Sequence, residues 1–458
     1  MQVASPEPAG GVANRQLEHG ECPHHWPPLA FLDETNLHPE LEVTWQWDSD
    51  QRTGSLRVEQ KQAGDQLYEL STCLRLEVGG QERDVPLRLS ERSHTFDVKL
   101  EEAPAQVLFD PGDVLLKTLK FERPRPLLLR QLSSASLGID RVLAARALAE
   151  KPDAAAVTAL GGALRSDAFW AVRAAAATAL GKTRRQDALD ALLAARAQEH
   201  PRVRRAVAAA LGEFRVDVEP GNARAARLLE DWVGSGDPSC FVEAVAAAAL
   251  GRVRSPRAVA ILATVLDRRS YMDTIRARAL EGLGATADEA AYAVIEAAIT
   301  RTASFQSRRA AVLALGRLAE GTANARRARE RLEACLSDPD FRVRMDAAAA
   351  LVEIGDARSI PALESAQKGE LDGRAKRRFR NAVRELRERG GGSEKLRKLG
   401  EEVERLRGES ARLRERLEKL EAQASAPTPP PPPAAAPVKR PRPGSHRTTR
   451  KPIVPRRR

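Results

Sequence analysis

The residues best suited to metal chemistry lie near the start of the chain, at His19, Cys22, His24 and His25. Imidazole and thiolate are ligand types that suit Zn²⁺ and Cu²⁺. Closed zinc sites, however, usually combine paired ligands from widely separated points of a chain. A flexible polar segment that happens to hold these residues explains the cluster more simply. We therefore predict no metal centre and no cofactor, and keep the four residues as the one candidate cluster.

The remaining spacings in the chain do not predict catalysis. Zinc hydrolysis by an H-E-x-x-H helix needs two imidazoles four residues apart on one ion and a glutamate as base, and the sequence has no such motif. It also has no G-x-S-x-G turn and no Gly-rich phosphate loop. We therefore expect that this chain is not itself an enzyme. The histidines are His19, His24, His25, His38, His94, His200 and His446.

A repeated element from about Gly138 to Leu386 predicts the largest part of the fold. It consists of a basic residue, an alanine-rich stretch and a closing Leu-Gly, as in VRAAAATALG (172–181) and VRRAVAAALG (203–212). From Gly181 to Gly355 the closing glycines are 31, 39, 33, 32 and 39 residues apart. That period fits one helical hairpin and indicates an α-solenoid. We expect the alanines to let neighbouring helices approach closely, and each closing glycine to end its helix in the left-handed conformation.

Between the two helices of a pair lies a short acidic turn, as at Ser166-Asp167, Asp237-Pro238 and Asp338-Pro339-Asp340, and at 338–344 it forms a D-P-x-x-x-V-R pattern. This pattern resembles HEAT repeats, in which the turn aspartate and the arginine stack in ladders between repeats. Asp237 lacks the arginine, because Glu243 stands there, so we expect the ladder to be interrupted in that repeat. The resemblance assigns a structural ladder role to Asp167, Arg173, Arg204, Arg276, Arg308, Asp338 and Arg344.

Composition changes predict further segments around the solenoid, which we place at residues 124–389. Residues 37–123 alternate between apolar and polar side chains in runs of five to nine, which predicts about six strands and a small antiparallel β-sandwich. Trp45 and Trp47 are expected in the core of this sandwich, and Phe169 and Trp170 between repeats. Residues 1–36 are rich in Pro, Gly and polar residues and read as a poorly ordered lead-in.

The glycines at 390–392 are expected to end the solenoid, and a heptad pattern follows. Its apolar spacing predicts a short coiled coil over 393–424, in which Glu402 and Glu409 would face Arg407 and Arg414 of a parallel partner helix. Two glycines inside this segment each weaken the helix by about 1 kcal/mol, so a homodimer is a hypothesis. The heptad positions are Leu396, Leu399, Val403, Leu406, Ser410, Leu413, Leu417 and Leu420.

The formal net charge of +11 belongs mainly to the end of the chain. Residues 426–458 hold nine Lys or Arg and no acid, which leaves 65 basic against 63 acidic residues elsewhere. We expect 425–458 to be a disordered, Pro-rich basic tail. It could contact nucleic-acid phosphates or an anionic membrane surface non-specifically, or serve only as a soluble end. Aromatic residues do not interleave it, so base stacking is unsupported.

The cysteine spacing and the lengths of the apolar runs indicate the cellular compartment. Cys22, Cys73, Cys240 and Cys335 lie far apart with no C-x-x-C pair, so we expect reduced thiols. The N-terminus does not show a basic region followed by an apolar core, and the apolar runs are too short to span a bilayer. These features predict a cytoplasmic protein without a transmembrane segment.

Residues 37–386 also resemble a larger family. HPELEVTWQWD (38–48) and VLFDPGDVLLKTLKFERP (107–124) look like the β-domain of M1-family zinc aminopeptidases and its exit into the helical domain. SDAFWAVRAAAATALG (166–181) resembles the HEAT-like C-terminal domain of bacterial members. The H-E-x-x-H helix, the downstream glutamate ligand, the G-A-M-E-N-like loop and the catalytic tyrosine of that family are absent. The resemblance therefore implies the non-catalytic half of such a peptidase.

Two functions follow as hypotheses. The first is a non-catalytic HEAT-repeat scaffold, derived from the C-terminal half of an M1-like aminopeptidase, that holds a protein or peptide on the concave face of the solenoid. The alternative is a partner or fragment of an M1 zinc aminopeptidase whose catalytic domain lies on another chain. An H-E-x-x-H sequence encoded immediately upstream would favour the alternative.

Overall fold

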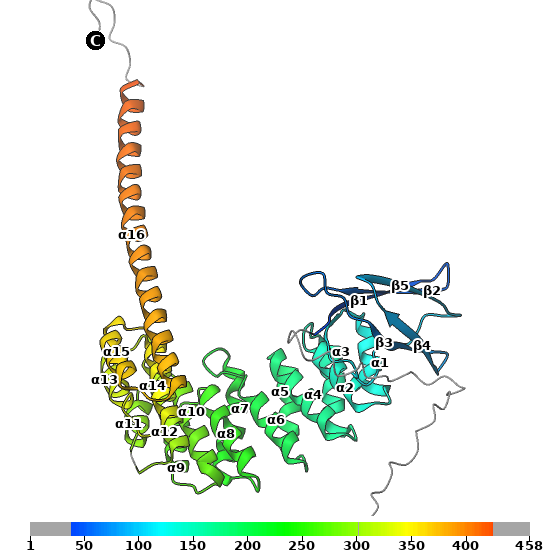
Figure 1. Ribbon diagram of the computed structural model, residues 1–458, viewed down its shortest axis with the longest axis horizontal. Coiled ribbons are helices and arrows are strands. Elements are labelled where there is room, and N and C mark those ends of the chain that lie inside the picture. The colour runs from blue at the N-terminus through cyan, green and yellow to red at the C-terminus, as the bar shows by residue number, and fades with distance from the viewer. Residues whose placement is uncertain (1–37, 301, 425–458) are drawn as a thin grey trace, which may run out of the picture. The chain divides into compact units, whose positions relative to one another are not determined.

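The computed structural model describes residues 38–300 and 302–424, with side chains described at 38–300, 302–389 and 402–414. The described chain is mainly helical, and two small sheets precede a row of helical pairs (Figure 1). The chain divides into two compact units, residues 1–389 and 390–458. The fold is therefore the predicted α-solenoid preceded by a small β region.

Two sheets pack their buried faces on one apolar core in the β region. The larger sheet has the order β5-β2-β1-β7 and the smaller one β4-β3-β6. One expectation needs correction, because β1 and β7 pair in parallel while all other described pairs are antiparallel. The strands are β1 (Glu40–Asp48), β2 (Thr53–Gln60), β3 (Leu70–Val78), β4 (Gln81–Leu89), β5 (Ser93–Lys99), β6 (Gln106–Phe109) and β7 (Thr118–Phe121).

The residues of β1 that face the core are buried to different degrees. Leu41 and Val43 are buried, whereas Trp45 and Trp47 are only half-buried at the edge of the core. The Trp45 ring covers Gly54 on the neighbouring strand, where a Cβ atom would lie 2.1 Å from the ring. A glycine at this point of β2 therefore makes room for the indole.

A buried ion pair closes the turn between β6 and β7. The Lys117 ammonium bonds to the Asp110 carboxylate, and it also donates to Asp113 Oδ1 at 2.7 Å. Asp110 further accepts from the Thr72 hydroxyl at 2.9 Å and from the Leu115 amide at 3.0 Å. The D-P-G-D-x-x-x-K segment is thus fixed where the chain leaves the sheets.

The solenoid consists of paired helices, and the even-numbered ones are the second helices of each pair (Figure 1). Short 3₁₀ turns at Pro220–Asn222, Tyr271–Asp273 and Ala357–Ser359 precede some helices. The helices are α1 (Arg125–Ser134), α2 (Gly138–Leu148), α3 (Ala154–Ser166), α4 (Trp170–Thr183), α5 (Gln186–Ala194), α6 (Pro201–Leu211), α7 (Ala223–Ser235), α8 (Cys240–Arg252), α9 (Ala258–Val265), α10 (Thr274–Ala285), α11 (Ala291–Ala298), α12 (Phe305–Ala319), α13 (Ala325–Cys335), α14 (Phe341–Ile354), α15 (Ile360–Gly369) and α16 (Gly373–Ala424).

Most closing glycines lie inside the second helices, so the expected left-handed helix ends are wrong for them. Among these glycines only Gly355 has a positive φ, of 75°. At Gly316 an added Cβ would come within 2.6 Å of the Ala350 Cβ atom, and at Gly251 within 1.9 Å of the Gly282 carbonyl oxygen. The glycines are needed because the next second helix passes at this point.

Close packing of the second helices creates one continuous surface, which we call the second-helix face. Neighbouring second helices contact one another more extensively than neighbouring first helices do. Elements that approach more closely on one side make that side the concave one in a repeat stack. The concave face expected from the sequence is therefore the second-helix face.

Helix α16 runs through the predicted boundary at 390–392, where the first compact unit ends. It is continuous from Gly373 to Ala424, so the three glycines do not end it. Each glycine weakens a helix by about 1 kcal/mol without blocking it sterically, and strong helix formers such as Arg, Glu, Lys and Leu flank them. Ala375 and Phe379 at its start are buried in the solenoid core, whereas every side chain described at 402–414 is exposed.

The cysteines also differ from expectation. Cys73 is disulfide-bonded, whereas Cys240 and Cys335 carry free thiols. The expectation of reduced thiols is therefore wrong for Cys73. Sequence spacing cannot show such a bond, because it depends on which residues the fold brings together.

Candidate functional site

A ladder of arginine–carboxylate pairs links consecutive repeats of the solenoid. In each pair Nε and Nη2 of an arginine on a second helix donate to the two oxygens of a carboxylate in the next hairpin turn. Such two-pronged pairs are strong and directional. They are Arg141–Asp167 at 2.8 and 3.0 Å, Arg204–Asp237 at 2.9 and 2.9 Å, Arg308–Asp338 at 2.9 and 2.9 Å, and Arg344–Glu370 at 2.7 and 2.8 Å.

The same arginines also close their own turns through the third nitrogen. Nη1 of Arg344 donates to the Asp338 carbonyl at 2.8 Å, and Nη1 of Arg204 donates to the Gln198 carbonyl at 2.9 Å. Hydrogen bonding from Arg344 lowers the pKa of Glu370 and keeps it charged. Every strong donor and acceptor of these pairs is therefore used within the solenoid.

Some residues predicted for the ladder lack a carboxylate partner. Arg173 donates to the Asp167 carbonyl at 2.6 Å, but the next repeat has Gln198 where the carboxylate would stand, and Arg173 Nε is buried without a hydrogen-bond partner. Arg276 donates to the Leu266 carbonyl and approaches the exposed Asp267 at only 3.8 Å.

The repeat that was expected to interrupt the ladder does not do so at Asp237, which pairs with Arg204. At the position of the missing arginine, Glu243 bonds to Arg268, so that pair has the opposite polarity. Sequence analysis also missed Arg141 and Glu370 as pair members. Pairing each turn acid with an arginine of the preceding repeat would have identified Arg141 as the partner of Asp167.

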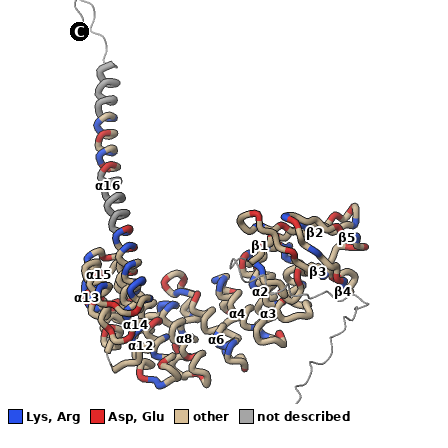
Figure 2. The backbone as a smooth tube through the Cα atoms, viewed as in Figure 1, with Lys and Arg blue, Asp and Glu red and all other residues tan. Residues whose placement is uncertain are grey.

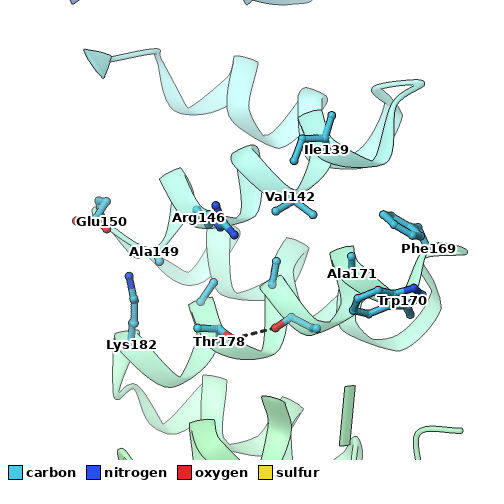
Figure 3. Close-up of a pocket in the computed structure, with 13 residues that line it drawn as sticks. Ile139, Val142, Arg146, Ala149, Glu150, Phe169, Trp170, Ala171, Thr178 and Lys182 are labelled. Carbon is cyan, nitrogen blue, oxygen red and sulfur yellow. Dashed lines mark hydrogen bonds between the residues drawn. The ribbon is translucent and has the colours of Figure 1, made fainter. Parts of the chain in front are cut away.

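A hollow of about 910 Å³ lies on the second-helix face between α2 and α4 (Figure 3). Its floor is formed by small apolar side chains, among them Val142, Ala149, Ala171, Ala175 and Ala179. The volume falls within the range of ligand-binding clefts. We call this hollow the α2–α4 groove.

Aromatic side chains form one end of the α2–α4 groove (Figure 3). The Phe169 ring is 42% exposed and rests on Gly138, where a Cβ would lie only 2.5 Å from it. The Trp170 ring stacks on His200 at 4.8 Å between centroids and lies 4.7 Å from the Arg202 guanidinium carbon. Trp170 thus packs between repeats as expected, but Phe169 is presented to the groove.

Charged side chains form the opposite end (Figure 3). Arg146 lies in the last turn of α2, Glu150 just after it, and Lys182 in the last turn of α4, and all three are exposed. Among the described residues none of the three forms an ion pair or a side-chain hydrogen bond, unlike the arginines of the ladder. These charges are therefore available to a bound molecule.

A second hollow, of about 520 Å³, lies where α6, α8, α10 and α12 end. Several of its arginines are compensated by carboxylates, although Arg252 donates only to the Ala209 carbonyl at 3.4 Å. Arg184 pairs with Glu213 at 3.1 Å, and Arg254 pairs at 2.8 Å with Asp217, whose pKa Arg215 lowers to about 2. Helix C-termini carry partial negative charge, so this hollow suits an anion less well. Figure 2 shows Lys and Arg interspersed with Asp and Glu along the whole solenoid.

Other sequence predictions fall outside this site. His19, Cys22, His24 and His25, the lead-in and the basic tail lie outside the described residues. Within 38–300 and 302–424, no group of three or more His, Cys, Asp or Glu is arranged to hold a metal ion. Over that same part of the chain, none of the helices has the length and apolar character needed to cross a membrane.

Helical hairpins stacked in register and joined by repeated ion pairs define an α-solenoid protein. The sequence model of HEAT repeats matches residues 125–212, 159–241, 195–284 and 294–384, which is more than half of the chain. The chain therefore belongs to the HEAT-repeat family. No curated protein matches it.

Among solved structures, the chain is similar to Legionella pneumophila aminopeptidase A in complex with aspartic acid, with 10% identity and a TM-score of 0.44 over 77% of this chain and 47% of that one. It thus spans about half of that protein. Human deoxyhypusine hydroxylase shows 18% identity and a TM-score of 0.26, over 58% of this chain and 96% of that one. The CpcE–CpcF phycocyanin lyase complex of Nostoc shows 20% identity and a TM-score of 0.31, over 58% of this chain and 95% of that one. At these values the likeness does not extend to function.

Proposed function

We propose that this chain is a non-catalytic HEAT-repeat scaffold that binds a segment of a partner protein on its second-helix face, in the α2–α4 groove. The observation that carries the proposal is the groove itself, with an apolar floor, a wall of packed aromatic rings and charges that have no partner in the described residues. An exposed concave apolar surface of this kind marks an interaction site.

The chemistry of the groove favours binding over catalysis. Its lining contains no His, Cys, Asp or Ser, and the Thr178 hydroxyl donates to the Ala174 carbonyl at 3.0 Å. The groove therefore offers neither a nucleophile with a base nor a metal-binding set. Purified protein supplied with zinc is expected to show no aminopeptidase turnover, and measurable turnover would contradict this part of the proposal.

Filling the groove tests the proposal directly. Ala175 lines the floor, and Ala206 has the same degree of burial on α6 but lies outside the groove. Peptides selected by display on the wild-type chain are expected to bind the Ala206→Leu variant normally and to lose binding to Ala175→Leu. If the selected peptides bind both variants equally well, the groove is not the binding site.

The homodimer through 393–424 is a second part of the proposal. In the described segment 402–414 of α16, Val403, Leu406 and Leu413 are 42%, 51% and 64% exposed. Apolar side chains at these heptad spacings are typical of a helix that pairs with another. A second copy of the chain would then give the scaffold two grooves and a higher avidity for a repeated partner.

The alternative, a partner or fragment of an M1 zinc aminopeptidase, rests on the sequence resemblance of residues 38–48 and 107–124. It predicts that an upstream gene encodes H-E-x-x-H and that its product copurifies with this chain. The scaffold proposal is wrong if a mixture of this chain and the upstream gene product removes N-terminal residues from peptides while neither protein does so alone.

The cytoplasmic location is a proposal that one observation weakens. Cys73 is disulfide-bonded, and such bonds are rare in reducing compartments. Thiol blocking during lysis of the native cells, followed by non-reducing peptide mapping, distinguishes a reducing compartment from an oxidising one. An alkylated Cys73 supports the cytoplasm, and a bonded Cys73 points to an oxidising compartment.

A further inference from the structure

We infer that the α2–α4 groove selects a partner segment in which apolar side chains are followed by an acidic side chain. The inference rests on the proposed function and specifies its ligand. It follows from the distribution of apolar surface and charge along the groove (Figure 3).

The apolar part of the ligand is defined by the floor and the aromatic wall. Alanines line most of the floor, so a large side chain of a partner can approach the helix backbones closely. Phe169 and Trp170 are held in place by Gly138 on one side and by His200 and Arg202 on the other. A wall fixed in this way loses little conformational freedom when a ligand binds.

The carboxylate is defined by the opposite end. Arg146 comes from α2 and Lys182 from α4, so the two cations flank the groove from both sides. Glu150 lies beside them and offsets part of their charge, which leaves a net positive end. A carboxylate entering here gains two attractive partners, whereas a cationic side chain would face both. The ligand therefore binds with its apolar residues toward Phe169 and its acid toward Lys182.

The two cations could also have a purely structural role, which has to be distinguished from ligand binding. Basic residues in the last turn of a helix interact favourably with its dipole, and Arg146 and Lys182 both occupy such positions. If that were their only role, neutral substitutions would lower thermal stability and leave ligand discrimination unchanged.

Two peptide-display libraries test the inference on the full chain. They share a randomised apolar core, which is followed in one by a fixed glutamate and in the other by a fixed lysine. Peptides whose binding is abolished by Ala175→Leu are expected to come from the glutamate library. Measured by fluorescence anisotropy, such a peptide should bind about three- to tenfold more tightly than its lysine counterpart.

Substitutions at the charged end complete the test. The preference for glutamate should disappear in the Arg146→Gln/Lys182→Gln variant and persist in Arg165→Gln, an exposed arginine of α3 outside the groove. Glu150→Gln should strengthen it. Equal recovery of groove-dependent binders from both libraries overturns the carboxylate preference and leaves the proposed function standing. If no binder from either library depends on Ala175, the proposed function itself fails.

Discussion

Arg308 and Asp338 lie in consecutive repeats and are joined by two hydrogen bonds of 2.9 Å, from Nε to Oδ2 and from Nη2 to Oδ1. Both side chains are about nine-tenths buried, at 10% and 8% exposure. Removal of one partner from a buried pair leaves an uncompensated charge and costs about 3–5 kcal/mol. We therefore expect Arg308→Met to lower the free energy of unfolding by an amount of this order.

The control for this prediction is Arg173, which occupies the same place in its repeat but lacks a carboxylate partner. In urea unfolding, Arg173→Met should cost clearly less than Arg308→Met. A double-mutant cycle with Asp338→Asn should give a coupling energy for the 308–338 pair. Equal losses at 173 and 308 would mean that the ion pair is not the source of the stability.

The missing partner of Arg173 offers a gain of stability. Gln198 stands where other repeats have a carboxylate, and its amide donates to the Leu164 carbonyl at 3.0 Å. Gln198→Asp should complete the pair with Arg173 and raise the unfolding free energy by about 1 kcal/mol, less at high salt. Gln198→Asn, which shortens the side chain without adding charge, is the control. A loss of stability that is equal in both variants would contradict the prediction.

The sequence predicted the solenoid because its repeated element occurs six times, so that a departure from the pattern in one copy does not change the interpretation. The sequence did not reveal the role of the closing glycines. A glycine that ends a helix and a glycine that lies where another helix crosses occur at the same spacing in the sequence. The structure separates them: Gly355 has a positive φ, and Gly251 touches the backbone of the next second helix.

The candidate site was harder to predict than the fold. Phe169 and Trp170 are adjacent in sequence and both line the groove, yet Phe169 rests on Gly138 of the preceding repeat and Trp170 stacks on His200 of the next. Arg146 and Lys182 gain their meaning only because α2 and α4 lie side by side and because no carboxylate among the described residues pairs with them. Neither fact can be read from local spacing.

Glycine at the helix crossings should be sensitive to the smallest substitution. A Cβ at Gly251 would lie 1.9 Å from the Gly282 carbonyl oxygen, so Gly251→Ala forces α8 and α10 apart. Overpacking of this kind costs about 1–3 kcal/mol or more. Gly162→Ala in α3 meets no atom within 4 Å and should instead stabilise its helix by about 1 kcal/mol. Thermal unfolding followed by circular dichroism measures both, and the same sign for the two variants would refute the argument.

Stability should fall in acid partly because of Glu370. Hydrogen bonding from Arg344 lowers the pKa of this carboxyl below its ordinary value. A lowered folded-state pKa contributes stability above the unfolded pKa, and that contribution is lost as the pH falls through the folded value. Burial raises the pKa of Asp346, which acts in the opposite sense.

Urea unfolding between about pH 6 and about pH 3 measures the effect of Glu370. The wild-type chain is expected to lose stability more steeply than the Glu370→Gln variant, which has no carboxyl to protonate there. Parallel pH profiles for the two proteins would show that the 344–370 pair does not contribute to the acid sensitivity.

The exposed face of α16 leads to the last prediction. Glu402 and Glu409 both bond to Arg405 within the single helix, and in a parallel dimer they would lie opposite Arg407 and Arg414 of the second copy. Light scattering at micromolar concentration should give the mass of two chains. Glu402→Arg/Glu409→Arg should give one, because all four positions would then repel their partners.

A complementary variant provides the control for the dimer. Arg407→Glu/Arg414→Glu alone should also be monomeric, and an equimolar mixture of the two variants should recover the mass of a dimer, since every facing pair is again of opposite sign. Gly408→Ala, whose added methyl meets no atom within 4 Å, should strengthen dimerisation by stabilising the helix. A wild-type mass of one chain, or a mixture that stays monomeric, would remove the parallel homodimer.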